Sequence, residues 1–329
     1  MASGDTAVLR TRSDLFGRLI ALLRGRTLPP LILLLLALCA GVEIVRPGTV
    51  TPTWVSNTVL FAVPLGILGA SQTIVLLTGG IDLSVSLVAT AAAFLLASNA
   101  VLGTPTAVLI ALSAGLVVGL LNGIGVGLLR VQPLVMTLGT ALMGLGAMTI
   151  YSQLVIAVHP EVPASIRFLG SGKLPGSLPA DMMVWLPLSL IIILGLRFTG
   201  FGRLLFAVGS NPGACHLAGV RVWRVLLAGY VLASLLAAVA GLVLVGSTNA
   251  ADLGLADALL LPSAAAAIIG GNSIFGGSGG YGGTIVGTLI LTVLNSLLTL
   301  LDMVEPVKQI LYGAIILLLA ALYSRIAEQ

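Results

Sequence analysis

The sequence predicts an all-α integral membrane protein with about ten transmembrane helices. Of its 329 residues, 58% are hydrophobic and only 8% are charged, whereas an ordinary soluble domain carries about a quarter charged residues. A soluble protein of this size needs more polar side chains to cover its surface. Uncharged stretches also recur that reach the roughly 20 residues a helix needs to cross a hydrocarbon core about 30 Å thick. A lipid bilayer is therefore the predicted solvent.

Ten apolar segments are expected to span the membrane. They are 28–45, 57–79, 83–101, 104–128, 132–153, 183–198, 222–245, 257–274, 283–301 and 306–324. Lys and Arg in short flanking loops favour the cytoplasm, and an N-in, C-in arrangement places most of the basic residues there. The residues predicted inside are Arg10, Arg12, Arg18, Arg24, Arg26, Arg130, Arg197, Arg203, Arg221, Arg224 and Arg325, and those predicted outside are Arg46, Arg167, Lys173 and Lys308.

We expect one transmembrane domain, residues 28–325, after a cytoplasmic N-terminal segment, residues 1–27. The N-terminal segment resembles the charged region of a signal peptide, but no convincing cleavage site follows the first apolar run. Cys39 and Cys215 fall at different predicted depths, so no disulfide framework is implied. The basic residues stand at the ends of apolar runs rather than in one stripe, which does not indicate nucleic-acid binding.

A short polar break interrupts the apolar sequence at residues 78–84, which read TGGIDLS. Paired glycines, Gly79 and Gly80, loosen a helix, and an acid near the membrane such as Asp82 is costly unless it is paired or faces water. One interpretation is a helix break that lines the transport route or braces its gate. The other is a helix cap, in which Asp82 or Ser84 accepts a hydrogen bond from the following helix.

Glycine recurs at every fourth position in the span 104–128. The residues are Gly115, Gly119, Gly123 and Gly127. Small residues at this spacing make a flat helix face on which another helix packs closely, so we predict a helix–helix seam here. Asn122 stands beside this face and is expected either to face the pathway or to hydrogen-bond to a neighbouring helix.

The predicted cytoplasmic loop, residues 199–222, is basic and too long for a minimal turn. Asn211 followed by a proline is typical of a helix start, and Gly219 of a helix end. We therefore predict a short exposed helix, which either lies on anionic lipid or docks a partner. His216 has no ligand companions on it, so a metal site is not expected.

Glycine dominates residues 270–283, which read GGNSIFGGSGGYGG. So many glycines disfavour a helix, and irregular backbone at membrane depth needs protein or water to satisfy it. No strand precedes the glycines, as a dinucleotide-binding motif requires. Residues 170–173, GSGK, lack the earlier glycine and the magnesium-binding Ser or Thr of a phosphate loop, so the chain itself is not expected to hydrolyse ATP.

Three of these segments resemble the permease subunits of ribose-type ABC sugar importers. They read TGGIDLSVSLVAT at 78–90, GRLLFAVGSNPGACHLAGV at 202–220 and GGNSIFGGSGGYGGTIVGTLI at 270–290. The likeness extends in matching order over about residues 55–322. Ser86 and Leu87 depart from the Gly and Ser that the family usually has, and the last segment lacks a common basic residue, so the choice of sugar stays open.

The resemblance implies an ABC importer permease fold in the bacterial inner membrane, with no cofactor bound by this chain. The implied partners are an ATPase subunit with two nucleotide-binding domains that holds ATP and Mg²⁺, a periplasmic sugar-binding protein, a second permease copy or paralogue, and membrane lipid. The implied ATPase-coupling residues are Gly209, Asn211, Ala214 and Gly219. The implied structural signatures near the pathway are Gly79, Gly80 and Asp82, and the glycine-rich turn at Gly270, Gly271, Gly276 and Gly277.

Four amide side chains inside the predicted spans are candidates for weak contacts with the substrate: Gln72, Asn122, Asn272 and Asn295. Each can instead hydrogen-bond between helices. Two other functions stay open. One is import of branched-chain amino acids or nucleosides. The other is ion-coupled secondary transport, which needs ionisable groups within the membrane, and Asp82 is the one acid near a predicted helix break.

Overall fold

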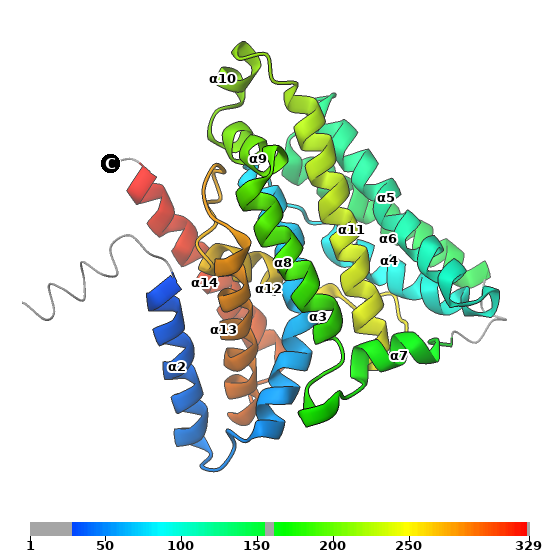
Figure 1. Cartoon of the computed structure of the whole chain (residues 1–329), viewed down its shortest axis with the longest axis vertical. Coiled ribbons are helices and arrows are strands. Elements are labelled where there is room, and N and C mark those ends of the chain that lie inside the picture. The colour runs from blue at the N-terminus through cyan, green and yellow to red at the C-terminus, as the bar shows by residue number, and fades with distance from the viewer. Residues whose placement is uncertain (1–27, 155–160, 328–329) are drawn as a thin grey trace, which may run out of the picture.

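The computed structural model describes residues 28–154 and 161–327, and the regular elements in these ranges are helices (Figure 1). The predicted N-terminal segment 1–27 and part of the predicted outer loop, residues 155–160, lie outside the described residues. The longer helices are α2 (Leu28–Val45), α3 (Pro52–Leu77), α4 (Val85–Ser98), α5 (Thr104–Gly127), α6 (Pro133–Leu154), α8 (Met182–Phe198), α9 (Gly200–Ser210), α11 (Val222–Thr248), α12 (Leu260–Ile269), α13 (Tyr281–Leu300) and α14 (Glu305–Ala327). The shorter ones are η1 (Ala100–Leu102), α7 (Ala164–Ser171), η2 (Pro175–Ser177), α10 (Pro212–Leu217) and η3 (Asp257–Leu259).

Six of the described helices are long and apolar enough to cross a membrane, namely α2, α3, α5, α6, α11 and α13. The pair α8 and α9 makes a seventh if it counts as one span, although the chain bends by 68° between them. The ten predicted spans are therefore not confirmed. The segments predicted at 83–101 and 257–274 contain α4, of 14 residues, and α12, of 10 residues. Helices this short do not cross a core about 30 Å thick at about 1.5 Å per residue.

Helix α3 occupies the centre of the fold. Every residue from Ala62 to Leu77 is buried, and α3 packs against α11, α13, α12 and α8. A helix that is apolar on all sides is stable only where other helices surround it or lipid does. Helix α2 lies at the edge, against α13 (Figure 1). The two short helices α4 and α12 are themselves largely buried, so they belong to the protein interior.

The predicted seam along the glycines of α5 is confirmed, and its partner is α11. A Cβ atom placed at Gly115 lies 2.8 Å from the carbonyl oxygen of Ser234, and one at Gly119 lies 2.7 Å from the Cα of Val231. One turn further on, a Cβ at Gly123 lies 2.8 Å from the Cα of Leu227. The absence of side chains along this face lets the two backbones approach each other closely.

We expect Gly119→Ala to lower the free energy of unfolding by about 1–3 kcal/mol, because the new methyl group overpacks the α5–α11 seam. The melting temperature of the purified protein in detergent should fall accordingly. Gly146→Ala on α6 is the matched control, since its Cβ meets nothing within 4 Å. That control is expected to stabilise by about 0.5–1 kcal/mol, as alanine is the better helix former. Equal melting temperatures for the two variants would contradict the seam.

Candidate functional site

Three segments far apart in the sequence meet at one junction: the end of α3, the end of α9 and the glycine-rich turn between α12 and α13. The backbone N–H of Gly277 donates a hydrogen bond of 3.0 Å to the carbonyl oxygen of Leu77. A Cβ placed at Gly276 lies 2.7 Å from the nitrogen of Gly79 and 2.9 Å from the carbonyl oxygen of Gly209. We call these contacts the glycine junction.

Glycine is required at this junction for two separate reasons. Gly79, Gly276 and Gly277 have φ values of +79°, +88° and +73°, a left-handed conformation that other residues rarely adopt. Gly209 is helical, but a Cβ there overlaps the carbonyl oxygen of Leu77 and lies 2.6 Å from the nitrogen of Gly277. A side chain at any of these positions therefore forces the segments apart.

The polar break after α3 is held by a buried hydrogen-bond network. Asp82 is fully buried, and its Oδ1 accepts bonds from the backbone N–H of Ser84 at 2.7 Å and from the Ser84 hydroxyl at 2.6 Å. Asn122 of α5 donates to the Ser84 hydroxyl at 2.9 Å, and Thr140 of α6 donates to Asn122 at 2.7 Å. The Asp82 carboxylate thus bonds to the residue that precedes α4, not to the first turn of α4.

The backbone of the same break is satisfied by two further side chains. Gln72 of α3 donates to the carbonyl oxygen of Asp82 at 2.7 Å. The hydroxyl of Thr137 on α6 accepts from the N–H of Leu83 at 3.1 Å and donates to the carbonyl oxygen of Ile81 at 3.3 Å. This is the condition under which irregular backbone is tolerated at membrane depth.

Asn272 holds the glycine-rich turn in an equivalent way. Its Nδ2 donates to the carbonyl oxygen of Ala267 at 2.7 Å and to the hydroxyl of Thr284 at 2.9 Å, while its Oδ1 accepts from the N–H of Gly280 at 2.8 Å. The hydroxyl of Thr284 also shares a 2.7 Å hydrogen bond with Thr73 of α3. The turn is therefore fixed to α12, α13 and α3 at once.

Three of the four candidate amides are bonded inside the chain. Gln72, Asn122 and Asn272 are buried. They hydrogen-bond to other segments of the chain, which is the alternative to substrate contact that the sequence left open. Asn295 instead lies exposed on α13. Contact of any of the four with a substrate stays a prediction.

Helix α8 connects the junction to the centre of the fold. The indole N–H of Trp185 donates to the hydroxyl of Tyr281 at 2.8 Å, and that hydroxyl donates to the carbonyl oxygen of Gly66 at 2.9 Å. These bonds join α8 to the first residue of α13 and to the middle of α3. After the 68° bend, α9 begins at a cap in which Thr199 accepts from the N–H of Gly202.

The predicted exposed helix is confirmed as α10. Asn211 caps it by accepting a 2.9 Å hydrogen bond from the N–H of Ala214, and Gly219 ends it with a φ of +82°. In the described structure Cys215 is its buried residue, whereas Leu217 is 90% exposed. Helix α10 stands at the far end of the molecule's long axis (Figure 1). A partner can therefore reach it without rearrangement of the fold.

Several residues of this site carry no local sequence signal that would single them out. Thr140 and Thr284 are each one of several threonines in their helices, and Trp185 stands in an apolar helix, so nothing in the local sequence distinguishes these three. Tyr230 of α11 is likewise buried, and its hydroxyl lies 2.7 Å from a Cβ placed at Gly80. Hydroxyl groups spaced along an apolar segment indicate a helix that can form interhelical bonds, but they do not show which of the hydroxyl groups form them.

Comparison with known proteins places the chain among transport permeases. Residues 54–320 match the family model described as "Branched-chain amino acid transport system / permease component". The fructose import permease protein of Rhizobium meliloti is 32% identical over 308 residues, 89% of this chain and 84% of the relative. The galactofuranose transporter permease protein of Escherichia coli is 32% identical over 269 residues, 80% and 77% of the two chains. The Escherichia coli autoinducer 2 import system permease protein is 31% identical over 297 residues, 86% and 89%. No solved structure matches.

We expect Gly209→Ala to open the glycine junction, because its methyl group overlaps the end of α3. The variant should lose about 1–3 kcal/mol of stability, and hydrogen exchange at the amide of Gly277 should become faster, since that amide bonds to Leu77. Gly200→Ala on the same helix is the control, as its Cβ comes no closer than 4.0 Å to a neighbour. Unchanged exchange at Gly277 in Gly209→Ala would argue against the junction.

A second prediction concerns Asp181, a buried residue in the loop just before α8. Burial raises the pKa of its carboxyl group to about 7, against the lowering effect of the neighbouring backbone amides. Because this pKa lies above the value of about 4 expected in the unfolded chain, the protein should lose stability as pH rises from about 4 to about 7, and this group should cause no further loss above that range.

The measurement is the melting temperature at pH 5.5 and pH 8.5 for the wild type, Asp181→Asn and the exposed control Asp302→Asn. Asp181→Asn should lose the pH dependence that the wild type and the control share. A wild-type slope that survives in Asp181→Asn would show that another group is responsible.

Proposed function

The chain belongs to the permease component family of branched-chain amino acid transport systems, and within that family we propose that it carries a sugar across the membrane. Membership makes it a multi-pass protein of the bacterial inner membrane and a non-catalytic subunit of an ABC importer of the carbohydrate type. The proposed substrate is a pentose or hexose handed over by a periplasmic binding protein. ATP hydrolysis belongs to a separate subunit with two nucleotide-binding domains.

The substrate class is supported by the relatives. Two of the three similar permeases described above are named for sugars, fructose and galactofuranose. The family description names branched-chain amino acids instead, so leucine is the competing substrate in any uptake assay. We propose sugar because two of these three relatives are named for sugars. The autoinducer 2 permease matches over a comparable share of both chains, so autoinducer 2 is a further substrate to assay.

The observation that carries the proposal is the direct contact of α9 with both broken segments at the glycine junction. We propose that residues 1–27 and α10 lie in the cytoplasm, with an N-in, C-in chain and a single permease domain at 28–325. The segment 199–222 then docks on the ATPase, with Gly209, Asn211, Ala214 and Gly219 shaping it. Movement of α10 reaches the end of α3 and the glycine-rich turn through α9, and α10 also contacts α11, which packs on α3.

The proposed mechanism is a population shift. ATP and a loaded binding protein favour a different facing state of the permease from the state that ADP favours, and their differential affinities move the equilibrium. Glycines 79, 276 and 277 hold their segments in contact with α9 without intervening side chains, so displacement of α9 is transmitted as a rigid shift. Helix α8 follows because Trp185 links it to Tyr281 at the start of α13.

We propose that the pathway binds sugar weakly, since a site tight enough to select the sugar would also retain it. Asn295 is the leading candidate contact among the four amides because its side chain is exposed on α13. Gln72, Asn122 and Asn272 act by holding the broken segments in place. A second permease copy or paralogue completes the pathway, and membrane lipid surrounds the pair.

The test is uptake of radiolabelled sugars and of leucine by proteoliposomes. The full assembly contains this chain, its ATPase, a candidate binding protein and internal ATP. Sugar uptake that needs every component is expected. Uptake by the chain alone, driven by an ion gradient and independent of ATP, would indicate secondary transport instead. ATP-dependent uptake of leucine but not of sugar would show that the substrate is an amino acid.

Leu217→Asp should weaken ATPase binding at least tenfold and reduce uptake in proportion, because a charge then replaces the exposed apolar tip of α10. The fold should be unaffected, since Leu217 is 90% exposed. Leu102→Asp, at a 56% exposed leucine of η1, is the matched control and should bind the ATPase as the wild type does. Equal loss in both variants would mean that α10 is not the docking helix.

A further inference from the structure

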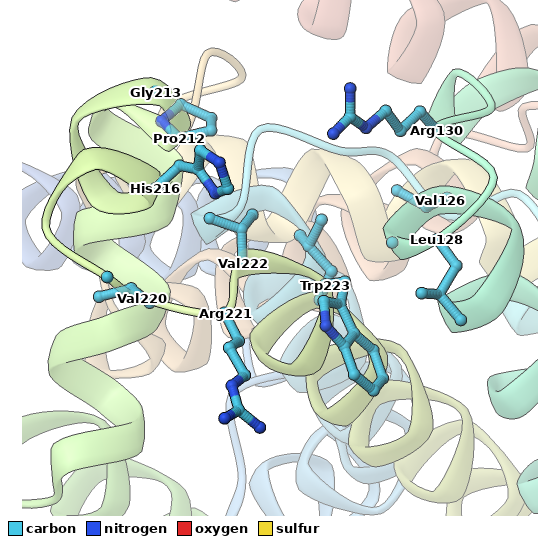
Figure 2. A pocket seen from close by; sticks show the side chains of 13 residues that line it. Val126, Leu128, Arg130, Pro212, Gly213, His216, Val220, Arg221, Val222 and Trp223 are labelled. Atoms are coloured by element: carbon cyan, nitrogen blue, oxygen red, sulfur yellow. The ribbon is translucent and has the colours of Figure 1, made fainter.

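A cleft of about 820 Å³ lies beside α10, bounded by the start of α11 and by the turn that joins α5 to α6 (Figure 2). Its lining includes three basic residues, Arg130, His216 and Arg221, and no acidic residue is among the described residues that line it. Figure 2 shows the side chain of Arg130 extending from the α5–α6 turn toward the side of the cleft where His216 projects from α10. Arg130 therefore supplies a cation on one side of the cleft, and His216 supplies an imidazole on the other.

Arg130 occupies a backbone position that favours glycine. Its φ is +57°, in the left-handed region that L-residues avoid. It follows α5 in a helix-ending turn, in which the N–H of Leu128 and of Leu129 bond to the carbonyl oxygen of Ile124 and the N–H of Val131 bonds to that of Gly125. Helices commonly end with glycine at such a position. An observed strained residue points to a role for its side chain.

We propose that this cleft binds a carboxylate side chain of the ATPase subunit, held by Arg130 from one side and by His216 from the other. The guanidinium fork of arginine matches a carboxylate with two parallel hydrogen bonds. The imidazole of His216 supplies a further N–H. Leu217, which follows His216 in the chain, does not line the cleft, so the cleft adds a contact with the same partner beside the exposed tip of α10.

The occupant is a protein carboxylate because of where the cleft lies. The inference rests on the proposed function, which assigns α10 to the ATPase. His216 is part of α10, so a partner seated on α10 also covers the mouth of the cleft. Helix α10 stands at the end of the molecule's long axis (Figure 1), away from the apolar flanks of α2, α6 and α8 that face lipid. An anionic lipid headgroup is the competing occupant, and the experiment separates the two.

The first arm compares binding of the purified ATPase to the wild type, Arg130→Gly and Arg130→Lys in nanodiscs. Arg130→Gly should raise the melting temperature, because glycine adopts the left-handed conformation without strain, and yet lower ATPase affinity at least tenfold with a shallower salt dependence. Arg130→Lys should have an affinity between those of Arg130→Gly and the wild type, because lysine keeps the positive charge but loses the two parallel hydrogen bonds of the guanidinium. The control is Arg167→Gln, an exposed cation of α7, which should bind the ATPase as the wild type does.

The second arm identifies the partner atom. The chain has two lysines, Lys173 and Lys308, and both are predicted on the opposite side of the membrane. A zero-length carbodiimide cross-linker joins lysine to carboxylate, so Arg130→Lys should yield a cross-link to an Asp or Glu of the ATPase that the wild type does not form. Peptide mass spectrometry locates it.

The outcomes separate three cases. If the wild type binds the ATPase and Arg130→Gly binds it equally well, the cleft contact is wrong while the proposed function stands. If Arg130→Gly weakens ATPase binding only when the nanodiscs contain anionic lipid, the occupant of the cleft is a lipid headgroup and the inference fails. If the wild type and Leu217→Asp both fail to bind the ATPase, the proposed function fails and takes the inference with it.

Discussion

The structure depends on the close approach of three backbones at the glycine junction. The end of α3, the end of α9 and the glycine-rich turn meet there mainly through backbone atoms, with the small side chain of Ser210 beside Gly277, and the Gly277 amide bonds directly to the carbonyl of Leu77. Intervening side chains can change rotamer and let the segments move relative to one another, whereas direct backbone contact does not allow this. Two interrupted helices and the segment that bends toward α10 are thereby joined into one unit.

Interrupted helices at membrane depth leave backbone groups unpaired, and the surrounding side chains of this chain satisfy them. Gln72 and Thr137 serve the first break, and Asn272 serves the second. The packing of α4 against α5 supports this arrangement, since Asn122 of α5 bonds to Ser84 at the start of α4. A buried polar group without a partner is costly, and most of the side-chain groups beside the breaks are paired, whereas Oδ2 of Asp82 and the Tyr230 hydroxyl have no hydrogen-bond partner among the described residues.

Local patterns were sufficient to predict the membrane class, the glycine seam of α5 and the bounds of α10, because each depends on residues close together in the sequence. The number of spans was not predictable in the same way. Hydropathy does not distinguish α4 or α12 from a full span, since the polar breaks beside them are short. The glycine junction joins Gly79, Gly209 and Gly277, and only tertiary structure reveals such long-range contacts. The hydrogen bonds of Gln72 and Asn272 join residues only 5 to 12 positions apart, but the sequence does not show how the backbone turns to bring those residues together.

The central claim is that α9 and the glycine-rich turn move as one body during the transport cycle. The most direct measurement is the distance between spin labels at Ala207→Cys and Phe275→Cys, with both native cysteines replaced, in the nucleotide-free and ATP-bound assembly. The account predicts an unchanged, narrow distance distribution for this pair, while a reference pair at Ala207→Cys and Leu102→Cys changes with ATP. A shift between positions 207 and 275 that accompanies the change in the reference pair would contradict it.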